Sequence, residues 1–242
     1  QIVEYLRAFL YGRMGWSPMN AHLIISGAFG IYHKETVVAV GGYRHDTVGE
    51  DMELIVRLHR MLSAQRKRYR ITFVPEPICW AEVPDNLKLL KKQRIRWQIG
   101  LIESLMMNRG LLFHDKGTFA GWLAFPFALF FEWFGPFVET LGYIIIITGF
   151  VVGFISIQAF ITFLILAVGF GVLLSTSALL LEEMSFHLYK RPWHIVVLFA
   201  VSLIENFGYR QLNTVWRVIA IYYYLRDKVR AKMARRKRKG RS

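Results

Sequence analysis

The feature that most constrains this chain is a block of 65 positions, residues 117–181, with two charged side chains, Glu132 and Glu139. A bilayer core accepts helices of about 20 apolar residues, so this block is long enough for several of them. The whole chain of 242 residues nevertheless contains 31 Lys and Arg against 17 Asp and Glu, so the charges are concentrated elsewhere. This partition excludes a soluble protein with a single core. It predicts a membrane protein with a soluble front end, residues 1–116, and a membrane region, residues 117–225.

Four segments of the membrane region are candidate spans. Residues 137–157 and 159–181 each reach the length of a span. Residues 119–134 are short and contain Pro126, whereas residues 194–225 are long enough but contain three charged side chains. If the front end and the C-terminus both lie in the cytosol, the number of crossings must be even. The sequence therefore predicts either two or four crossings.

Residues 226–242 form a basic tail with ten Lys and Arg against one acid, Asp227. Basic clusters bind phosphates without sequence preference. After a membrane block, however, we expect the partner to be the anionic cytoplasmic leaflet rather than nucleic acid. Repulsion between the like charges predicts little local order in the tail. The basic pair Lys190 and Arg191 indicates a cytosolic loop, which favours two crossings.

The front end is expected to combine helices with strands and turns. Residues 1–16 have apolar side chains at three- and four-residue spacing, which predicts an amphipathic helix. Residues 17–45 carry turn and strand signals around several glycines. Residues 69–77 alternate like a strand and contain two prolines near their end.

Two acids, Glu50 and Asp51, end the segment TVGED, residues 47–51. The apolar residues that follow have helical spacing, so both acids are predicted in or just before a first helical turn. Acids at this place complement the helix dipole in many helices without any catalytic role. The pattern by itself leaves a structural role open beside that of a catalytic carboxylate.

A further helix is predicted from the N-cap candidate Asp85 to about Asn108. It carries Gln93, Arg96 and Trp97 at positions i, i+3 and i+4, which project from one face. Arginine binds phosphate oxygens in a fork, and tryptophan offers a flat apolar face to a sugar ring. A basic amphipathic helix on a membrane surface, with Trp at the headgroup level, would give the same pattern.

The order of ISGAFG, GGY, TVGED and QRIRW, followed by a hydrophobic block, resembles the C-terminal half of family 2 membrane glycosyltransferases. These are the processive synthases of cellulose, hyaluronan, chitin and poly-N-acetylglucosamine. TVGED matches their T/G-E-D motif, and QRIRW matches their Q-x-x-R-W motif. The resemblance implies an α/β, GT-A-like catalytic domain, here only its acceptor-side half, followed by an α-helical transmembrane region. It also favours four crossings over two, and we expect four.

This resemblance implies an inverting glycosyltransferase that moves a sugar from a nucleotide sugar, in particular a UDP-sugar, to a growing glycan or a lipid-linked acceptor. Asp51 would be the general base, and Glu50 would orient the site. Gln93 and Arg96 would face the diphosphate, and Trp97 would carry the acceptor sugar. A divalent metal, Mg²⁺ or Mn²⁺, is implied, with ligands outside this chain. We therefore expect the isolated chain to insert in membranes without turnover.

Ionisable groups inside apolar segments usually face a protein interior or a water-filled path, because exposure to lipid is expensive. Glu132, Glu139, Glu205 and Gln211 are therefore candidates for lining a glycan path. The alternative is that Glu205 and Arg210 simply pair with one another or lie at an interface.

These expectations place the protein in the inner (plasma) membrane of the cell, as a multi-pass protein with its catalytic side and C-terminus in the cytosol. Two other function classes remain open. One is a catalytically silent membrane subunit of a polysaccharide synthesis or export complex, and the other is a membrane anchor or transport component. The intact TVGED and QRIRW segments favour the enzyme, because a subunit without catalysis has no physical need for both.

Overall fold

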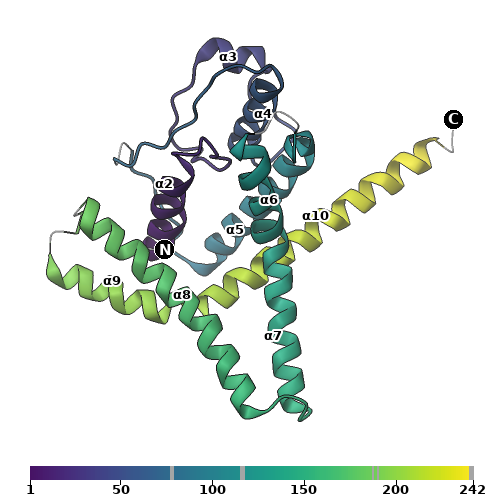
Figure 1. Cartoon of the computed structure of the whole chain (residues 1–242). Helices are drawn as coiled ribbons and strands as arrows, with labels where there is room; N and C mark the ends of the chain where they lie inside the picture. Colours follow the sequence, from purple (N-terminus) through teal and green to yellow (C-terminus); the bar gives the residue numbers. More distant parts are fainter. Residues whose placement is uncertain (77–78, 115–117, 187, 190, 240–242) are drawn as a thin grey trace.

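The computed structural model describes residues 1–76, 79–114, 118–186, 188–189 and 191–239. Every regular element within these residues is a helix. Figure 1 shows a front end of helices and irregular loops, a helical hairpin that extends away from it, and a long C-terminal helix that leaves the body obliquely. The α/β character that the resemblance implies is therefore not confirmed in the described residues.

The chain begins with one helical stretch, as the apolar spacing of residues 1–16 predicts. Its middle third is π-helical, and its parts are α1 (Ile2–Tyr5), η1 (Leu6–Tyr11) and α2 (Gly12–Trp16). Val3 and Leu6 are buried against Leu179 and Leu198, which belong to two helices of the membrane region. The N-terminal helix therefore lies between the front end and the membrane region.

The two helices predicted after TVGED and around QRIRW are present as α4 (Glu50–Ala64) and α5 (Leu87–Met107). The N-cap of α5 is Asn86, whose side chain accepts a hydrogen bond from the Leu89 amide at 2.9 Å. The prediction of Asp85 as the cap is therefore wrong. Asn86 has the extended backbone that an N-cap needs, and Asp85 instead accepts from the Asn86 side chain.

The predicted strand at residues 69–77 is wrong for its described part, residues 69–76. Residues 69–76 belong to no helix or strand. The Ile71 amide donates to Asn20 at 2.7 Å, and the Phe73 amide donates to Ser17 at 3.2 Å. These side chains occupy donors that a strand partner would use. Within residues 17–45, where strand signals were also predicted, the structure has a short helix, α3 (Lys34–Ala39).

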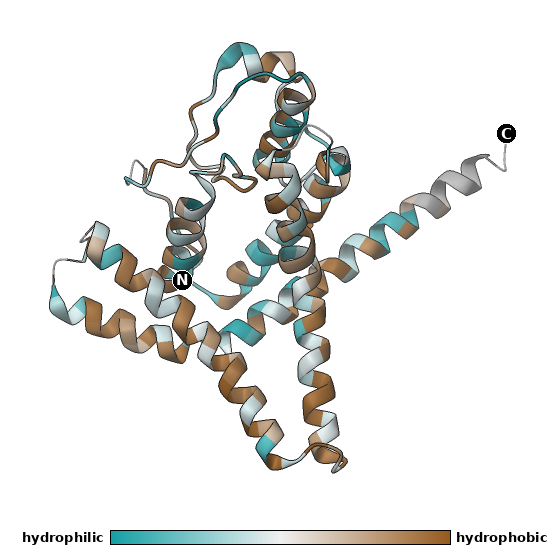
Figure 2. Ribbon diagram, in the orientation of Figure 1, coloured by the Kyte–Doolittle hydropathy of each residue, from teal (hydrophilic) through white to brown (hydrophobic). Residues whose placement is uncertain are grey.

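Residues 120–151 form one helical stretch of 32 residues, and not the two separate segments that the sequence predicts. Its parts are η3 (Ala120–Ala124), α6 (Phe125–Phe127), η4 (Ala128–Phe134) and α7 (Gly135–Val151). The predicted span at 137–157 ends at Val151, because the chain turns before α8. Helix α8 (Ile157–Ser185) confirms the span predicted at 159–181. Figure 2 shows that α7 and α8 are hydrophobic along most of their length.

The first half of this stretch packs on the front end. Its small or aromatic side chains Ala120, Ala124, Phe125 and Ala128 are buried in one core with residues of α4, α5 and the short 3-10 helix η2 (Arg109–Leu111). A segment that looked like a short span is therefore partly covered by protein. The predicted boundary between residues 116 and 117 lies outside the described residues.

Helices α9 (Pro192–Ile204) and α10 (Tyr209–Lys239) are separated by a bend of 57°. By length and composition, the described residues contain two helices able to cross a membrane, or three if this bent pair counts as one span. The described residues therefore supply fewer candidate spans than the four crossings expected, because residues 119–134 do not form a separate span. Low order is also wrong for residues 226–239 of the tail, since α10 continues as a helix to Lys239, whereas residues 240–242 lie outside the described residues. Ala, Lys and Arg are good helix formers.

Candidate active site

The TVGED segment is docked directly on the helix that carries QRIRW. A Cβ atom on Gly49 would lie 2.7 Å from the Cα of Gly100, and one on Gly100 would lie 2.8 Å from the Cα of Gly49. Cβ atoms do not make non-bonded contacts this short, so backbone meets backbone and both positions require glycine. The contact lies between the N-cap of α4 and the middle of α5. It joins TVGED to the helix of QRIRW, although the two motifs are far apart in the sequence.

Side chains of α5 hold the loop in place. The hydroxyl of Thr47 and the backbone amide of Val48 donate to the same oxygen of Glu103, at 2.8 and 3.0 Å. The hydroxyl of Ser104 donates to the carbonyl of Gly49 at 3.3 Å. Sequence reasoning missed Glu103 and Ser104. Their signal was their spacing, because they lie three and four residues after Gly100 on a helix.

The motif residues continue the docking face of α5. Positions 96 and 97 lie three and four residues after 93, and 100 and 103 follow at further three-residue steps, so all five lie on one side of the helix. With a rise of 1.5 Å per residue, Arg96 lies about 6 Å along the axis from Gly100. Gln93 is half-buried, whereas Arg96 and Trp97 are exposed. The structure therefore brings Gln93, Arg96 and Trp97 to the side of α5 on which TVGED is docked.

Asp51 lies in the first turn of α4, as predicted, and is partly buried. A Cβ atom on Gly27 would lie 2.9 Å from Oδ2 of Asp51, so the Ser26-Gly27-Ala28 turn passes close to the carboxylate. The guanidinium of Arg13 is also near. Burial lowers the pKa of Arg13 to about 10, and the negative charge of Asp51 acts in the opposite direction, so Arg13 stays charged at neutral pH. Sequence reasoning missed Arg13, and Glu50 beside Asp51 is exposed.

Trp97 is supported from the N-terminal helix. Its ring centroid lies 5.9 Å from that of Phe9, and the guanidinium of Arg94 lies 4.5 Å from it. Arg13 in turn lies 4.5 Å from the ring of Phe9. Side chains of the N-terminal helix therefore extend from Asp51 to Trp97. With 38% of its surface exposed, Trp97 still has free indole area for a ligand.

A buried ion pair supports α4 below the TVGED loop. Glu53 and Arg57, both almost fully buried, form a salt bridge of 3.0 Å, and Asn108 donates to Glu53. Arg57 also donates to the carbonyls of Val40 and Gly42. The pair thereby ties α4 to the Gly41-Gly42 turn and to the end of α5.

The acids of the long helical stretch are paired with bases of α10. Glu132 forms a salt bridge of 2.9 Å with Arg217, which also donates to Gln98 of α5 at 2.8 Å. Glu139 lies 3.5 Å from Arg210. These contacts join α10 to the front end and to α7.

Glu205 is 7% exposed and pairs with Arg7 of the N-terminal helix, while Ser175 of α8 donates to it. The suggested side-chain pair between Glu205 and Arg210 is therefore wrong, since each has a different partner. Gln211 donates to the hydroxyl of Tyr143 at 3.3 Å, which adds a further contact between α10 and α7.

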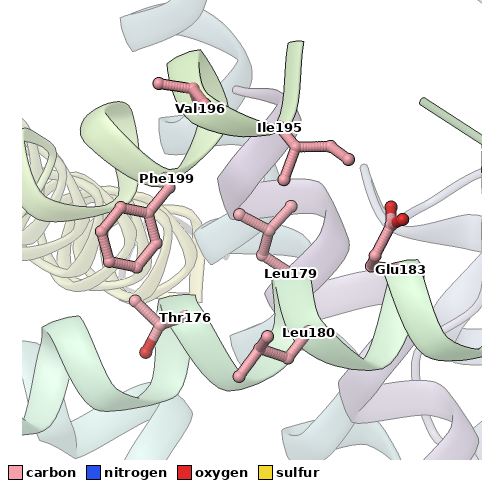
Figure 3. A pocket seen from close by; sticks show the side chains of 7 residues that line it. All are labelled: Thr176, Leu179, Leu180, Glu183, Ile195, Val196 and Phe199. Atoms are coloured by element: carbon pink, nitrogen blue, oxygen red, sulfur yellow. The ribbon is translucent and has the colours of Figure 1, made fainter. Parts of the chain in front are cut away.

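A hollow of about 250 Å³ lies elsewhere, between α8 and α9. Figure 3 shows its lining, which is apolar apart from Thr176 and Glu183. A charged sugar nucleotide needs basic groups, and this lining has none. The hollow is therefore not a donor site.

A divalent metal needs several ligand side chains that lie close together. In the part of the chain that the structure describes, no three His, Cys, Asp or Glu side chains lie close enough to hold a metal ion together. Asp51 has Arg13 as its charged neighbour instead. These residues do not fit a divalent metal by themselves.

Two curated relatives were compared with the chain. The poly-β-1,6-N-acetyl-D-glucosamine synthase of Staphylococcus aureus (strain COL) is 36% identical over 110 residues, which is 45% of this chain and 25% of the relative. The synthase of the same name from Staphylococcus epidermidis is 31% identical over 108 residues, with the same coverage. The chain thus spans about a quarter of the length of these relatives.

No solved structure matches the chain. The family match is much longer than the curated ones, since the model of glycosyl transferase family group 2 matches residues 5–174. This range is more than half of the chain, and it includes TVGED, QRIRW, the whole of α7 and most of α8. The chain therefore belongs to glycosyl transferase family group 2.

Proposed function

We propose that this chain supplies the acceptor-side part of a membrane-bound inverting glycosyltransferase. The donor is a nucleotide sugar, in particular a UDP-sugar, and the acceptor is a growing glycan or a lipid-linked sugar. The observation that carries this proposal is the glycine-to-glycine contact that docks TVGED on α5. It fixes a carboxylate, an amide, a guanidinium and an indole relative to one another, and acceptor-side sugar transfer needs these groups together.

In this proposal Asp51 is the general base. It takes the proton from the acceptor hydroxyl while the hydroxyl oxygen forms its bond to the anomeric carbon and the nucleoside diphosphate leaves from the opposite face. The partly buried position of Asp51 in the first turn of α4, next to the loop that is docked on α5, supports this role. Glu50 is exposed next to it and orients the site.

Gln93 and Arg96 bind the diphosphate, and Trp97 carries the terminal acceptor sugar on its free indole surface. The exposed guanidinium of Arg96 offsets the negative charge that develops on the leaving group. A divalent metal bound with the donor would add positive charge at the diphosphate. Its ligands would have to come from other residues than those around Asp51, so no step here depends on it.

The membrane region is proposed to cross the inner (plasma) membrane twice, with the front end and the basic tail in the cytosol. Arg217 supports this count, because this residue in the first third of α10 is bonded to Gln98 of the front end and so holds this part of the helix against the front end. The basic end of α10 would then lie against the anionic leaflet rather than nucleic acid.

A glycan path past Glu132, Glu139, Glu205 and Gln211 remains part of the proposal. Its support is that all four side chains sit where α10 or its bend meets other helices of the protein, and not on a lipid-facing surface. Each acid already has a basic partner, so the path would be charge-balanced along these contacts.

The test is Asp51→Asn in the full-length protein, assayed in detergent with UDP-N-acetylglucosamine, the donor that the relatives' names suggest. Turnover should fall about 100-fold to 10,000-fold, because the amide cannot accept the proton. Donor binding, measured by titration calorimetry, should stay the same. Asp46→Asn is the matched control, since Asp46 is an exposed acid on the same loop.

Near-normal turnover of the Asp51→Asn variant would remove Asp51 from the role of base. The second candidate, a catalytically silent membrane subunit, predicts a different result. It requires that the wild-type full-length protein itself binds no nucleotide sugar and transfers none, so the wild-type assay separates the two.

A further inference from the structure

The most buried member of the QRIRW segment is one that the Q-x-x-R-W motif leaves unspecified. Arg94 is 5% exposed, whereas its neighbours Arg96 and Trp97 are exposed. The guanidinium of Arg94 lies 4.5 Å from the ring centroid of Trp97, within the range of a cation–π contact. A guanidinium is planar and rigid, so its position restricts the tilt of a ring that packs against it.

Arg94 is held in turn by a carboxylate of the N-terminal helix. Its Nη2 donates to Oε2 of Glu4 at 2.7 Å. A buried guanidinium needs a counter-charge, and Glu4 supplies it. The same Oε2 accepts a hydrogen bond of 2.7 Å from the hydroxyl of Tyr209. One oxygen atom therefore connects α1, α5 and α10.

Tyr209 is the first residue of α10, directly after the 57° bend. One turn further along the N-terminal helix, Arg7 is bonded to Glu205, which lies on the other side of the same bend, and to Ser175 of α8. The N-terminal helix is thus fastened to both sides of the bend. A shift of the bend would be transmitted to Glu4, and from Glu4 through Arg94 to the indole.

We propose that Tyr209, Glu4 and Arg94 are positioning residues that set the orientation of Trp97 for the acceptor sugar and couple it to the bend before α10. This inference rests on the proposed function, because it takes Trp97 as the acceptor platform. It goes beyond that function by assigning three residues outside the recognised motifs and by linking acceptor binding to a membrane helix.

The principal test is Tyr209→Phe in the full-length protein labelled with 5-fluorotryptophan. This change removes one hydroxyl and keeps the ring, so the fold should survive it. The ¹⁹F signal of Trp97, identified as the one missing in Trp97→Phe, should shift while the signals of the other tryptophans stay. The KM for a β-1,6-linked N-acetylglucosamine oligosaccharide should rise about threefold to tenfold, which is the size of effect expected for the loss of one typical hydrogen bond. The KM for the nucleotide sugar should not change.

Arg94→Lys is the second variant. It keeps the charge that neutralises Glu4 but loses the plane that packs on Trp97, so it should shift the same ¹⁹F signal and raise the acceptor KM at least as much. Tyr222→Phe is the matched control for Tyr209, because Tyr222 lies on α10 with 61% of its surface exposed. It should change neither the spectrum at Trp97 nor either KM.

Two results would overturn the proposal, and they differ in meaning. An unchanged Trp97 signal in both variants would show that these residues do not orient the indole, whatever the enzyme does. A second result is that the Trp97 signal shifts in both variants, but Trp97→Ala has a normal KM for the acceptor. In that case Trp97 is not the platform for the acceptor sugar, and the proposed acceptor site is wrong. A merely structural role would instead raise both KM values or alter all tryptophan signals.

Discussion

Helices α4 and α5 of the front end bury their facing side chains in protein, whereas α7 and α8 of the hairpin leave most of theirs uncovered. Two isoleucines illustrate the contrast. Ile102 of α5 is fully buried, and Ile165 of α8 is 65% exposed. The membrane must supply the burial that the hairpin lacks. Figure 2 shows the same division, with mixed colours in the front end and mostly hydrophobic colour in the hairpin.

This difference indicates which contacts fix the positions of side chains in each region. Lipid can cover the apolar surface of the hairpin, so its two helices need few specific contacts with other parts of the protein. The front end must keep two motifs in a fixed relation, and it does so with a backbone contact at Gly49 and bonds from Glu103. A small change should therefore have a large effect in the front end and a small one in the hairpin.

The largest effect is expected for a single methyl group at the contact between the motifs. Gly49→Ala places a Cβ atom 2.7 Å from the Cα of Gly100, so α4 and α5 must move apart. A shift of about 1 Å in the position of a catalytic group can lower the rate about 100-fold, and we expect kcat for sugar transfer to fall by at least that factor. Gly142→Ala in α7 is the matched change in the hairpin, because it meets nothing within 4 Å. It should leave turnover intact, and equal losses in the two variants would contradict the comparison.

A moderate effect is expected from acid, because the front end buries neutral histidines. Burial lowers the pKa of His59 to about 4, and its ring nitrogens contact the carbonyl of His22 and the hydroxyl of Tyr69. Burial also lowers the pKa of His22 to about 4, and Arg13 adds to this. The unfolded chain takes up these protons near pH 6.5, before the folded chain does. The stabilisation is therefore complete above pH 6.5 and is lost as the pH falls towards 4.

For His59 alone the loss should reach about 3 kcal/mol of unfolding free energy. Urea denaturation in detergent at pH 7.5, 5.5 and 4.5 measures it. His59→Gln, whose amide can still donate to the His22 carbonyl, should have a flatter pH dependence. Parallel curves for the variant and the wild type would show that His59 does not cause the acid sensitivity.

Local patterns in the sequence were sufficient for the helices. The apolar spacing after Asp51 predicts α4, and the length of the apolar run predicts α8, because both signals depend on residues close in the chain. The alternation at residues 69–77 failed because a strand needs a partner, and side chains of Asn20 and Ser17 take its donors instead. Hydropathy also failed at residues 119–134, since it cannot tell whether lipid or the front end covers an apolar face.

The candidate site could be predicted only in part, for a related reason. The motifs name Asp51, Gln93, Arg96 and Trp97, and the structure places them on elements that touch. Whether each performs its expected chemistry stays a prediction. The partners that fix them, such as Glu103, come from elsewhere in the sequence with no motif of their own. These contacts form only where segments far apart in the sequence meet in the fold. They therefore cannot be identified from one sequence alone.

The smallest effect is expected in the hairpin itself. Ile165→Ala should change the unfolding free energy by less than about 0.5 kcal/mol, because the lost side chain contacts lipid in both the folded and the separated helices. The same substitution at Ile102 should cost about 2–5 kcal/mol, because it leaves a cavity between α5 and its neighbours. Thermal denaturation in detergent compares the two directly. If Ile165→Ala were as destabilising as Ile102→Ala, the exposed face of α8 would have to be covered by protein rather than lipid. The contrast between the two regions would then hold for one chain but not for the assembled protein.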